Sequence, residues 1–317
     1  MQMVHHAVDV HGPSVSQGKR SPEAVGTVLT WIEPLVRESV SMAFRYTSSL
    51  RGRRPEWLVA ASTVRLADIS GGTDCTRLHF EAPRFGEAAA DLYQQRELFD
   101  TRPREDDTGF DLIGDIVTDI ACQSRDSLRF DAHLLRRLER FGGAGGKWGV
   151  QSLALHGDRL PEDTPLSIDS RVSSLASALC RETPPPQRGR IAGRLDMIRA
   201  SDGSFSMILD SQQIVRGVWV PDDVSILADS WGKYVVVEGP VVFRPSGALL
   251  RIEAEGMVPA RDEDLFFSVA PEPAGIELDP DRLHKPQSRA SGVGAVFGKW
   301  PGEETEEEIL ATLKDLS

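Results

Sequence analysis

Three aspartates at four-residue intervals are the residues of this sequence whose type and spacing most suggest chemistry. Asp111, Asp115 and Asp119 lie in the stretch FDLIGDIVTDIACQS, whose apolar residues recur at helical spacing. Four-residue steps place the carboxylates on one helix face, where they could gather a divalent cation as acidic groups do in hydrolytic sites. The sequence assigns them no histidine or glutamate partner. We therefore favour a solvated helix face, and an enzyme is the alternative if these carboxylates line a pocket.

Other catalytic motifs are incomplete or absent in this sequence. The stretch GGAGGKWG suggests a phosphate-binding loop, but that motif requires glycine where Phe141 stands and a hydroxyl group where Trp148 follows Lys147. We interpret this stretch as a glycine-rich connection after a helix. The sequence has no H-E-x-x-H zinc motif, no G-x-S-x-G elbow and no cysteine-nucleophile signature. It therefore predicts a non-enzymatic binding protein without catalytic residues, metal site or cofactor.

The composition is that of a soluble globular chain. Its 317 residues, 40% of them hydrophobic, suffice for two domains or one large one. A net charge of −12 argues against a surface that attracts nucleic acid or anionic membrane everywhere, so any nucleic-acid role must be local. No apolar run approaches the roughly 20 residues of a membrane-spanning helix, and the three cysteines form no C-x-x-C pair. We predict a cytoplasmic protein without membrane partners.

The N-terminal residues give no clear structural signal. They include His5, His6 and His11, which could bind a metal ion adventitiously, and they lack the apolar core of a signal peptide. We interpret residues 1–24 as a disordered arm.

Residues 25–183 are predicted to form an α+β domain, which would position the three aspartates. Helical spacing marks VLTWIEPLVRESVSMAFRYTSSL, the aspartate stretch and DAHLLRRLERFGGAGG, the last ending at Gly142 and Gly143. Alternation in DCTRLHFEAP after the turn SGGT predicts a hairpin, and GVQSLALH a further short strand. Three successive prolines, Pro184–Pro186, then break the chain. We place a domain boundary there.

Residues 187–260 are predicted to form a small β-barrel. The pattern gives three strands, a short helix opened by Pro221, and two more strands. This order resembles the OB-fold, a five-stranded barrel with a helix between its third and fourth strands. In the first strand, Ile191, Leu195 and Met197 form the apolar face. A short β-sandwich or an unrelated half-barrel would give nearly the same pattern.

The opposite face of that first strand is a candidate nucleic-acid surface. Arg188, Arg190 and Arg194 share it, and arginines in a groove attract the phosphate backbone. Against this, residues 187–260 contain eight basic and nine acidic residues, whereas nucleic-acid faces usually carry excess positive charge. Nucleic-acid binding through these arginines is therefore the alternative function.

The C-terminal residues carry the most specific pattern. Residues 261–296 are predicted to be a flexible linker, and residues 297–317 read FGKWPGEETEEEILATLKDLS. Thr305 and Glu308 form a capping box, which starts a helix of about three turns, too short to be stable alone in water. The helix therefore needs a surface to pack against. Its apolar stripe consists of Ile309, Leu310, Leu313 and Leu316.

The tail at 297–317 resembles the W-P-G-[DE]-E-T-x-E-E-I/L tails that end many short bacterial antitoxins paired with PIN-domain ribonuclease toxins. The resemblance implies that the tail occupies a groove on a metal-dependent ribonuclease, with Trp300 as an aromatic anchor and Lys299 close to the acidic active site. This chain is far longer than a typical antitoxin and has no evident DNA-binding head. Packing of the tail on the chain's own body is the alternative. The partner-binding residues so implied are Lys299, Trp300, Pro301, Ile309, Leu310, Leu313 and Leu316.

Overall fold

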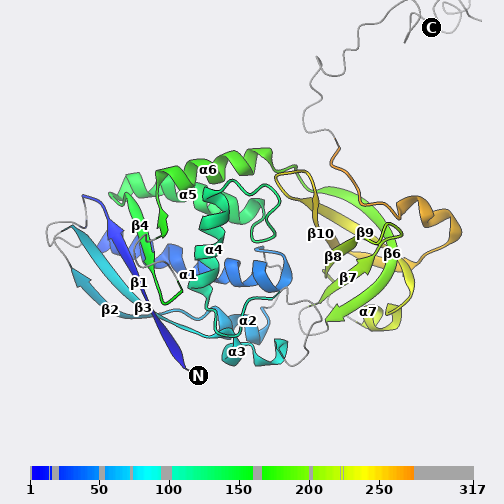
Figure 1. Ribbon diagram of the computed structural model, residues 1–317, viewed down its shortest axis with the longest axis horizontal. Coiled ribbons are helices and arrows are strands. Elements are labelled where there is room, and N and C mark those ends of the chain that lie inside the picture. The colour runs from blue at the N-terminus through cyan, green and yellow to red at the C-terminus, as the bar shows by residue number, and fades with distance from the viewer. Residues whose placement is uncertain are drawn as a thin grey trace, which may run out of the picture. The chain divides into compact units, whose positions relative to one another are not determined.

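The computed structural model combines helices and sheets in an α+β architecture (Figure 1). Residues Met1–Ala274 form one compact unit. Apolar residues before and after Pro184–Pro186 nevertheless belong to two different hydrophobic cores. We call the part up to Glu182 the body and the part from Gln187 the barrel. The structure describes residues 2–13, 15, 21–49, 54–71, 74–93, 102–159, 166–199, 203–221, 223 and 225–274.

A five-stranded antiparallel sheet forms one layer of the body, in the order β2–β3–β1–β4–β5. The hairpin predicted around SGGT is confirmed, since its two strands pair directly as β2 and β3. The helices lie on one side of this sheet (Figure 1). The strands are β1 (Met3–His11), β2 (Arg65–Gly71), β3 (Cys75–Pro83), β4 (Ser152–His156) and β5 (Leu166–Ile168).

The prediction of a disordered arm is wrong for the first strand, which is the central strand of this sheet. Val8 and Val10 are fully buried in the core, and they alternate with Asp9 and His11 on the other face. The sequence of β1 reads as a run of histidines and short apolar residues. The polar residues on its second face therefore obscured the two-residue alternation that predicts a strand.

The helices of the body pack their apolar faces against the sheet. The helix over the aspartates, α4, begins with a capping box in which the Thr108 hydroxyl and the Asp111 carboxylate each bond backbone N–H groups. The predicted helix stop at Gly142 and Gly143 is wrong, since the backbone of α5 continues to Trp148 and Gly149 then takes φ 74°. The helices are α1 (Pro22–Arg45), α2 (Glu56–Ala61), α3 (Phe85–Ala88), η1 (Ala90–Leu92), α4 (Gly109–Ala121), α5 (Ala132–Trp148) and α6 (Ser170–Glu182).

The barrel is a closed sheet of five strands that follow one another as β6–β7–β8–β10–β9, with β9 pairing back to β6. The pairing of β8 with β10 is parallel and the others are antiparallel. The short helix α7 lies between the third and fourth strands, as predicted, and the arrangement is compatible with an OB-fold. The elements are β6 (Gln187–Arg199), β7 (Ser204–Ile208), β8 (Ile214–Trp219), α7 (Ser225–Ser230), β9 (Tyr234–Phe243) and β10 (Leu249–Ala254).

Two details of the barrel differ from the sequence prediction. A bulge between Leu195 and Met197 shifts the register of β6, so Ile198 packs on the core in place of Met197. The residues after Ala254 also continue the fold, with strand β11 (Gly256–Pro259) on β9 and the 3-10 helix η2 (Asp262–Phe267). The predicted linker from residue 261 is thus ordered up to residue 274; the remainder, 275–296, lies outside the described residues.

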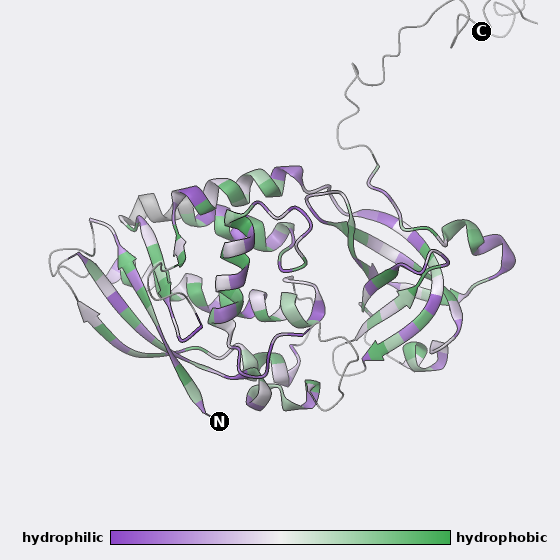
Figure 2. Cartoon of the chain, viewed as in Figure 1, coloured by the Kyte–Doolittle hydropathy of each residue, from purple (hydrophilic) through white to green (hydrophobic). Residues whose placement is uncertain are grey.

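Apolar contacts join the body to the barrel. Met42 of α1 packs with Val242 of β9 and Leu250 of β10, and Leu128 borders this small cluster. The hydropathy colouring shows the alternation of polar and apolar residues along strands and helices that produces these buried faces (Figure 2). Within the described part of the chain, no helix combines the length and apolar character needed to cross a bilayer.

Candidate functional site

A pocket of about 660 Å³ lies where the body meets the barrel. Its lining comes from the end of α1, the segment before α4, α4 itself, the turn at 126–129 and the barrel strand β8. Five arginines and four aspartates give the lining a net charge of +1, in a chain whose net charge is −12. The charged side chains are Arg102, Arg104, Asp107, Asp115, Asp119, Asp126, Arg129, Arg159 and Arg216.

Two of the three aspartates singled out in the sequence line this pocket. Asp115 and Asp119 do so, whereas Asp111 lines a separate pocket of about 270 Å³. Both pocket carboxylates face Arg129, whose Nη1 lies 3.0 Å from Asp119 Oδ2 and whose Nε lies 3.6 Å from Asp115 Oδ2. The Asp119 carboxylate also accepts a hydrogen bond from Ser127. The spacing therefore does place them at a pocket, as members of an ion-pair network that holds the 126–129 turn.

Burial raises the pKa of Asp115, and the positive charge of Arg129 offsets part of that rise. Neighbouring Asp119 raises the pKa of Asp115 further. Two like charges on successive turns of α4 are thus tolerated because a guanidinium lies between them. Chemically, the arrangement neutralises the carboxylates rather than presenting a free acid–base pair.

The segment before α4 forms another wall of the pocket. Asp107 pairs with Arg159 and accepts a hydrogen bond of 2.7 Å from the backbone N–H of Arg104. The guanidinium of Arg104 itself has no ion pair with any carboxylate of the described residues. The Arg104 guanidinium therefore lies at the pocket wall beside a carboxylate that pairs with another arginine, Arg159.

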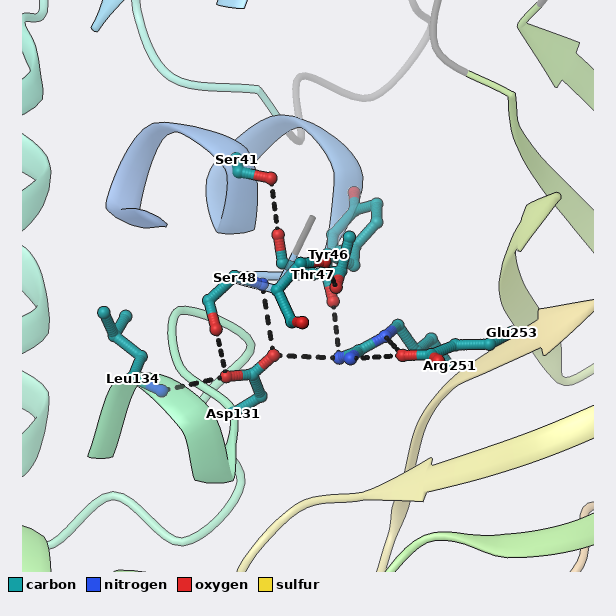
Figure 3. Close-up of polar contacts among 9 residues, drawn as sticks. Ser41, Tyr46, Thr47, Ser48, Asp131, Leu134, Arg251 and Glu253 are labelled. Atoms are coloured by element: carbon teal, nitrogen blue, oxygen red, sulfur yellow. Dashed lines mark hydrogen bonds and ion pairs between the residues drawn. The ribbon is translucent and has the colours of Figure 1, made fainter. Parts of the chain in front are cut away.

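A buried ion pair at the edge of the pocket joins the barrel to the body (Figure 3). Arg251 of β10 is 3% exposed and Asp131, just before α5, is 4% exposed. The Nη1 group of Arg251 lies 3.2 Å from Asp131 Oδ2 and donates a hydrogen bond of 2.8 Å to the carbonyl oxygen of Tyr46. Its Nη2 group donates to Glu253 at 2.7 Å, and Ser48 donates to Asp131 through both its N–H and its hydroxyl. We call Asp131 and Arg251 the latch.

The latch carboxylate is held in its charged form. Burial alone raises the pKa of Asp131, but the charge of Arg251 and the hydrogen bonds from Ser48 and Leu134 outweigh burial and place the pKa below its ordinary value. The buried charge is thus paired and hydrogen-bonded, which is the condition under which a buried ion pair is tolerated.

Tyr46 connects the latch to the pocket. It ends α1 in the left-handed conformation, with φ 57°, and its ring lies under the guanidinium of Arg216, 4.7 Å from ring centroid to Cζ. No carboxylate of the described residues pairs with Arg216. Burial lowers the pKa of Arg244, the negative charge of Asp126 offsets part of that effect, and the like charge of Arg216 lowers the pKa further. The barrel therefore contributes one guanidinium, that of Arg216, to the pocket lining, with Arg244 and Asp126 close behind it.

The smaller pocket contains a buried histidine. The Nε2 atom of His6 lies 3.0 Å from the Thr108 hydroxyl, and its ring stacks on Phe110 at 4.8 Å. Burial lowers the pKa of His6, with Asp111 raising it in part. A Cβ at Gly157 would lie 2.6 Å from His6 Nδ1, so glycine gives the ring its space. This histidine is a neutral core residue at the edge of a pocket.

The outer face of the sheet holds a group that could ligate a metal ion. Ligand atoms of Asp9, His11 and Cys75 lie within 4.8 Å of one another. The Asp9 oxygens are already bound by Arg77, at 2.6 and 2.7 Å, and by His156 at 2.9 Å. A guanidinium on the carboxylate opposes a second cation there. His11, which the sequence placed in the arm, thus lies beside possible ligands, but the carboxylate is already neutralised.

The predicted arginine face of β6 exists, because its three arginines are exposed on one side of the strand. Each of them lies beside a carboxylate, however, so the face carries little free positive charge. The ion pairs are Arg188–Glu255 at 3.0 Å, Arg190–Glu238 at 3.1 Å and Arg194–Asp196 at 3.9 Å.

The partner-binding residues predicted in the tail, Lys299 through Leu316, lie outside the described residues. Sequence patterns did not identify Tyr46, Asp131 or Arg251. The one local signal was a charge inside the apolar strand ALLRIEAEG, which is unusual unless the charge meets a buried partner.

No protein-family model, curated protein or solved structure matches this chain detectably. The function of this chain is therefore inferred from its own residues.

Proposed function

We propose that this chain is a cytoplasmic binding protein, similar to an antitoxin, whose C-terminal tail docks on and inhibits a PIN-type ribonuclease. The observation that carries the proposal is the tail motif itself, with Trp300, Pro301, Gly302, Glu304 and Thr305 in the order of antitoxin tails. In this proposal the body and barrel form a scaffold that presents the tail.

The chemistry of the tail supports a docking role. The capping box of Thr305 and Glu308 specifies a helix that starts just after the Pro-Gly break. A short helix with one apolar stripe gains stability when that stripe enters a groove, which is the helix-in-groove mode of recognition. Trp300 supplies the large apolar surface typical of binding hot spots. The neutralisation of Asp115 and Asp119 by Arg129 also favours binding over acid–base catalysis at the pocket.

The test is coexpression of the full chain with the protein encoded beside it, followed by copurification and a ribonuclease assay. We expect deletion of residues 297–317 to abolish the complex and Trp300→Ala to weaken it about thirtyfold or more. Trp231→Ala is the matched control, since Trp231 is 64% exposed on the barrel and should leave the complex intact. An unchanged complex after the deletion, or a partner without ribonuclease activity, would exclude the proposal.

The second candidate function is nucleic-acid binding by the barrel, which we propose to be an OB-fold. The specific observation in its favour is the exposed row of arginines on β6, combined with the strand order of the barrel. A titration of single-stranded oligonucleotide at rising salt tests it, because electrostatic binding must weaken steeply as salt increases. Absence of binding at low salt rules it out.

A further inference from the structure

The pocket between body and barrel contains more positive charge than its own carboxylates neutralise. Asp115 and Asp119 pair with Arg129, and Asp107 pairs with Arg159. The fourth aspartate, Asp126, accepts a hydrogen bond from Ser246 and lies near Arg244. Of the lining arginines, Arg104 and Arg216 form no ion pair with a described carboxylate. Unlike the arginines on β6, they line a concave site.

The position of Arg216 is fixed before any ligand binds. Its guanidinium lies over the ring of Tyr46, and the carbonyl of Tyr46 accepts a hydrogen bond from the buried Arg251. A guanidinium stacked on an aromatic ring keeps its N–H groups directed along its edge, free to bind an anion in a bidentate manner. Arg244, behind this wall, lies near both Arg216 and the carboxylate of Asp126, so Asp126 offsets part of the positive charge there.

The remaining lining is apolar and of small-molecule size. Ala43, Leu112, Ile116 and Leu128 supply an apolar surface beside the charged groups. The volume of about 660 Å³ lies within the range of small-molecule sites, roughly 300–1,000 Å³. An anion with an organic part therefore fits better than a bare inorganic ion.

We propose that this pocket binds a small organic phosphate, whose phosphate group is held by Arg104 and Arg216. The organic part of the ligand lies against Leu112, Ile116 and Leu128. A phosphate carries about −1.5 to −2 charges near pH 7 and three acceptor oxygens, which suits two guanidinium groups from different segments. Because Arg104 belongs to the body and Arg216 to the barrel, the ligand bridges the two.

Calorimetric titration of the full-length protein tests the proposal, with adenosine monophosphate, glycerol 3-phosphate, inorganic phosphate and adenosine as probes. We expect at least one of the two organic phosphates to bind more tightly than inorganic phosphate, and adenosine not to bind. Arg104→Ala and Arg216→Ala should each weaken that binding about tenfold or more, because each removes a charge-assisted hydrogen bond.

Two further variants make the result specific. Arg216→Lys keeps the charge but loses the planar fork, so it should weaken binding less than alanine does. Arg261→Ala removes an exposed arginine of the barrel outside both the pocket and the β6 face, and should leave the affinity unchanged. Thermal unfolding of each variant confirms that it folds.

Three results would overturn the assignment. They are no binding of any phosphate probe at millimolar concentration, equal binding of adenosine and its monophosphate, and equal losses of affinity in the Arg261→Ala and Arg216→Ala variants. Deleting residues 297–317 should not change phosphate affinity. This arm separates the pocket from the proposed role of the tail, so either proposal can fail alone.

Discussion

The barrel has two sets of arginines, which differ in their burial and in their partners. Arg251 and Arg216 face the body, one in a buried ion pair and the other over an aromatic ring. Arg188 and Arg190 lie on the outer side of β6, half-exposed beside glutamates. The difference shows that burial and partner geometry, rather than the presence of arginine, decide whether a guanidinium joins the body to the barrel or lies paired on an exposed surface.

Breaking the latch should have the largest effect. Asp131→Ala leaves the guanidinium of Arg251 buried without its carboxylate, and removing one partner of a buried pair costs about 3–5 kcal/mol. We expect this loss in the free energy of unfolding, measured by urea denaturation. Asp126→Ala is the control, because Asp126 is exposed at the same interface and bonds Ser246 of the barrel. A loss below about 1 kcal/mol would place the latch among ordinary surface pairs.

The same carboxylate should make stability depend on acid pH. The pKa of Asp131 in the folded protein lies below its ordinary value of 3.8. As the pH falls, this carboxylate is therefore protonated in the unfolded state before it is protonated in the folded state. Its contribution to stability is fully present above pH 3.8 and is lost as the pH falls through the folded pKa, by at most about 1.4 kcal/mol per pH unit. Unfolding free energies of the wild type and Asp131→Asn, measured from pH 7 downward, should converge below pH 3.8. Parallel curves would mean that the latch carboxylate does not contribute.

Removing the pocket arginine that neutralises α4 should have an intermediate effect. Arg129→Ala leaves Asp115 and Asp119 facing each other, and we expect a loss of about 1 kcal/mol because both sides of the pair are partly exposed. The pKa of Asp115 should rise further, since the charge of Arg129 now lowers it. An NMR titration of the Asp115 side chain measures this rise. Arg125→Ala, which breaks an exposed pair with Glu182, should leave the pKa of Asp115 unchanged.

The contrast between the two arginine sets also marks what the sequence could predict. Periodicity identified the strands of the barrel and the outward direction of Arg188 and Arg190, because both depend on neighbours along the chain. It also placed Asp115 and Asp119 on one helix face. The partners Glu238 and Arg129 could not be predicted, since pairing across strands and turns depends on register.

The missed features share a physical cause. Asp131 and Arg251 are 120 residues apart, and no local pattern records a contact of that separation. The strand β1 was missed for a related reason, since its burial depends on β3 and β4 on either side. The pocket is likewise a product of packing, because Tyr46 of the body and Arg216 of the barrel come from distant parts of the sequence.

The smallest effect is expected on the outer face of β6, where the comparison can be made sharpest. Arg190→Ala should change the free energy of unfolding by less than about 0.5 kcal/mol, because its pair with Glu238 is exposed and Arg188 also lies 3.5 Å from that glutamate. Glu238→Gln removes the carboxylate partner of Arg190 and leaves Arg188 with Glu255 alone. If the glutamates are what keep this face from binding nucleic acid, this variant should bind single-stranded oligonucleotide at low salt more tightly than the wild type, with the added affinity lost at high salt. Absence of oligonucleotide binding by both the wild type and Glu238→Gln at low salt would mean that the arginines on this face do not bind nucleic acid.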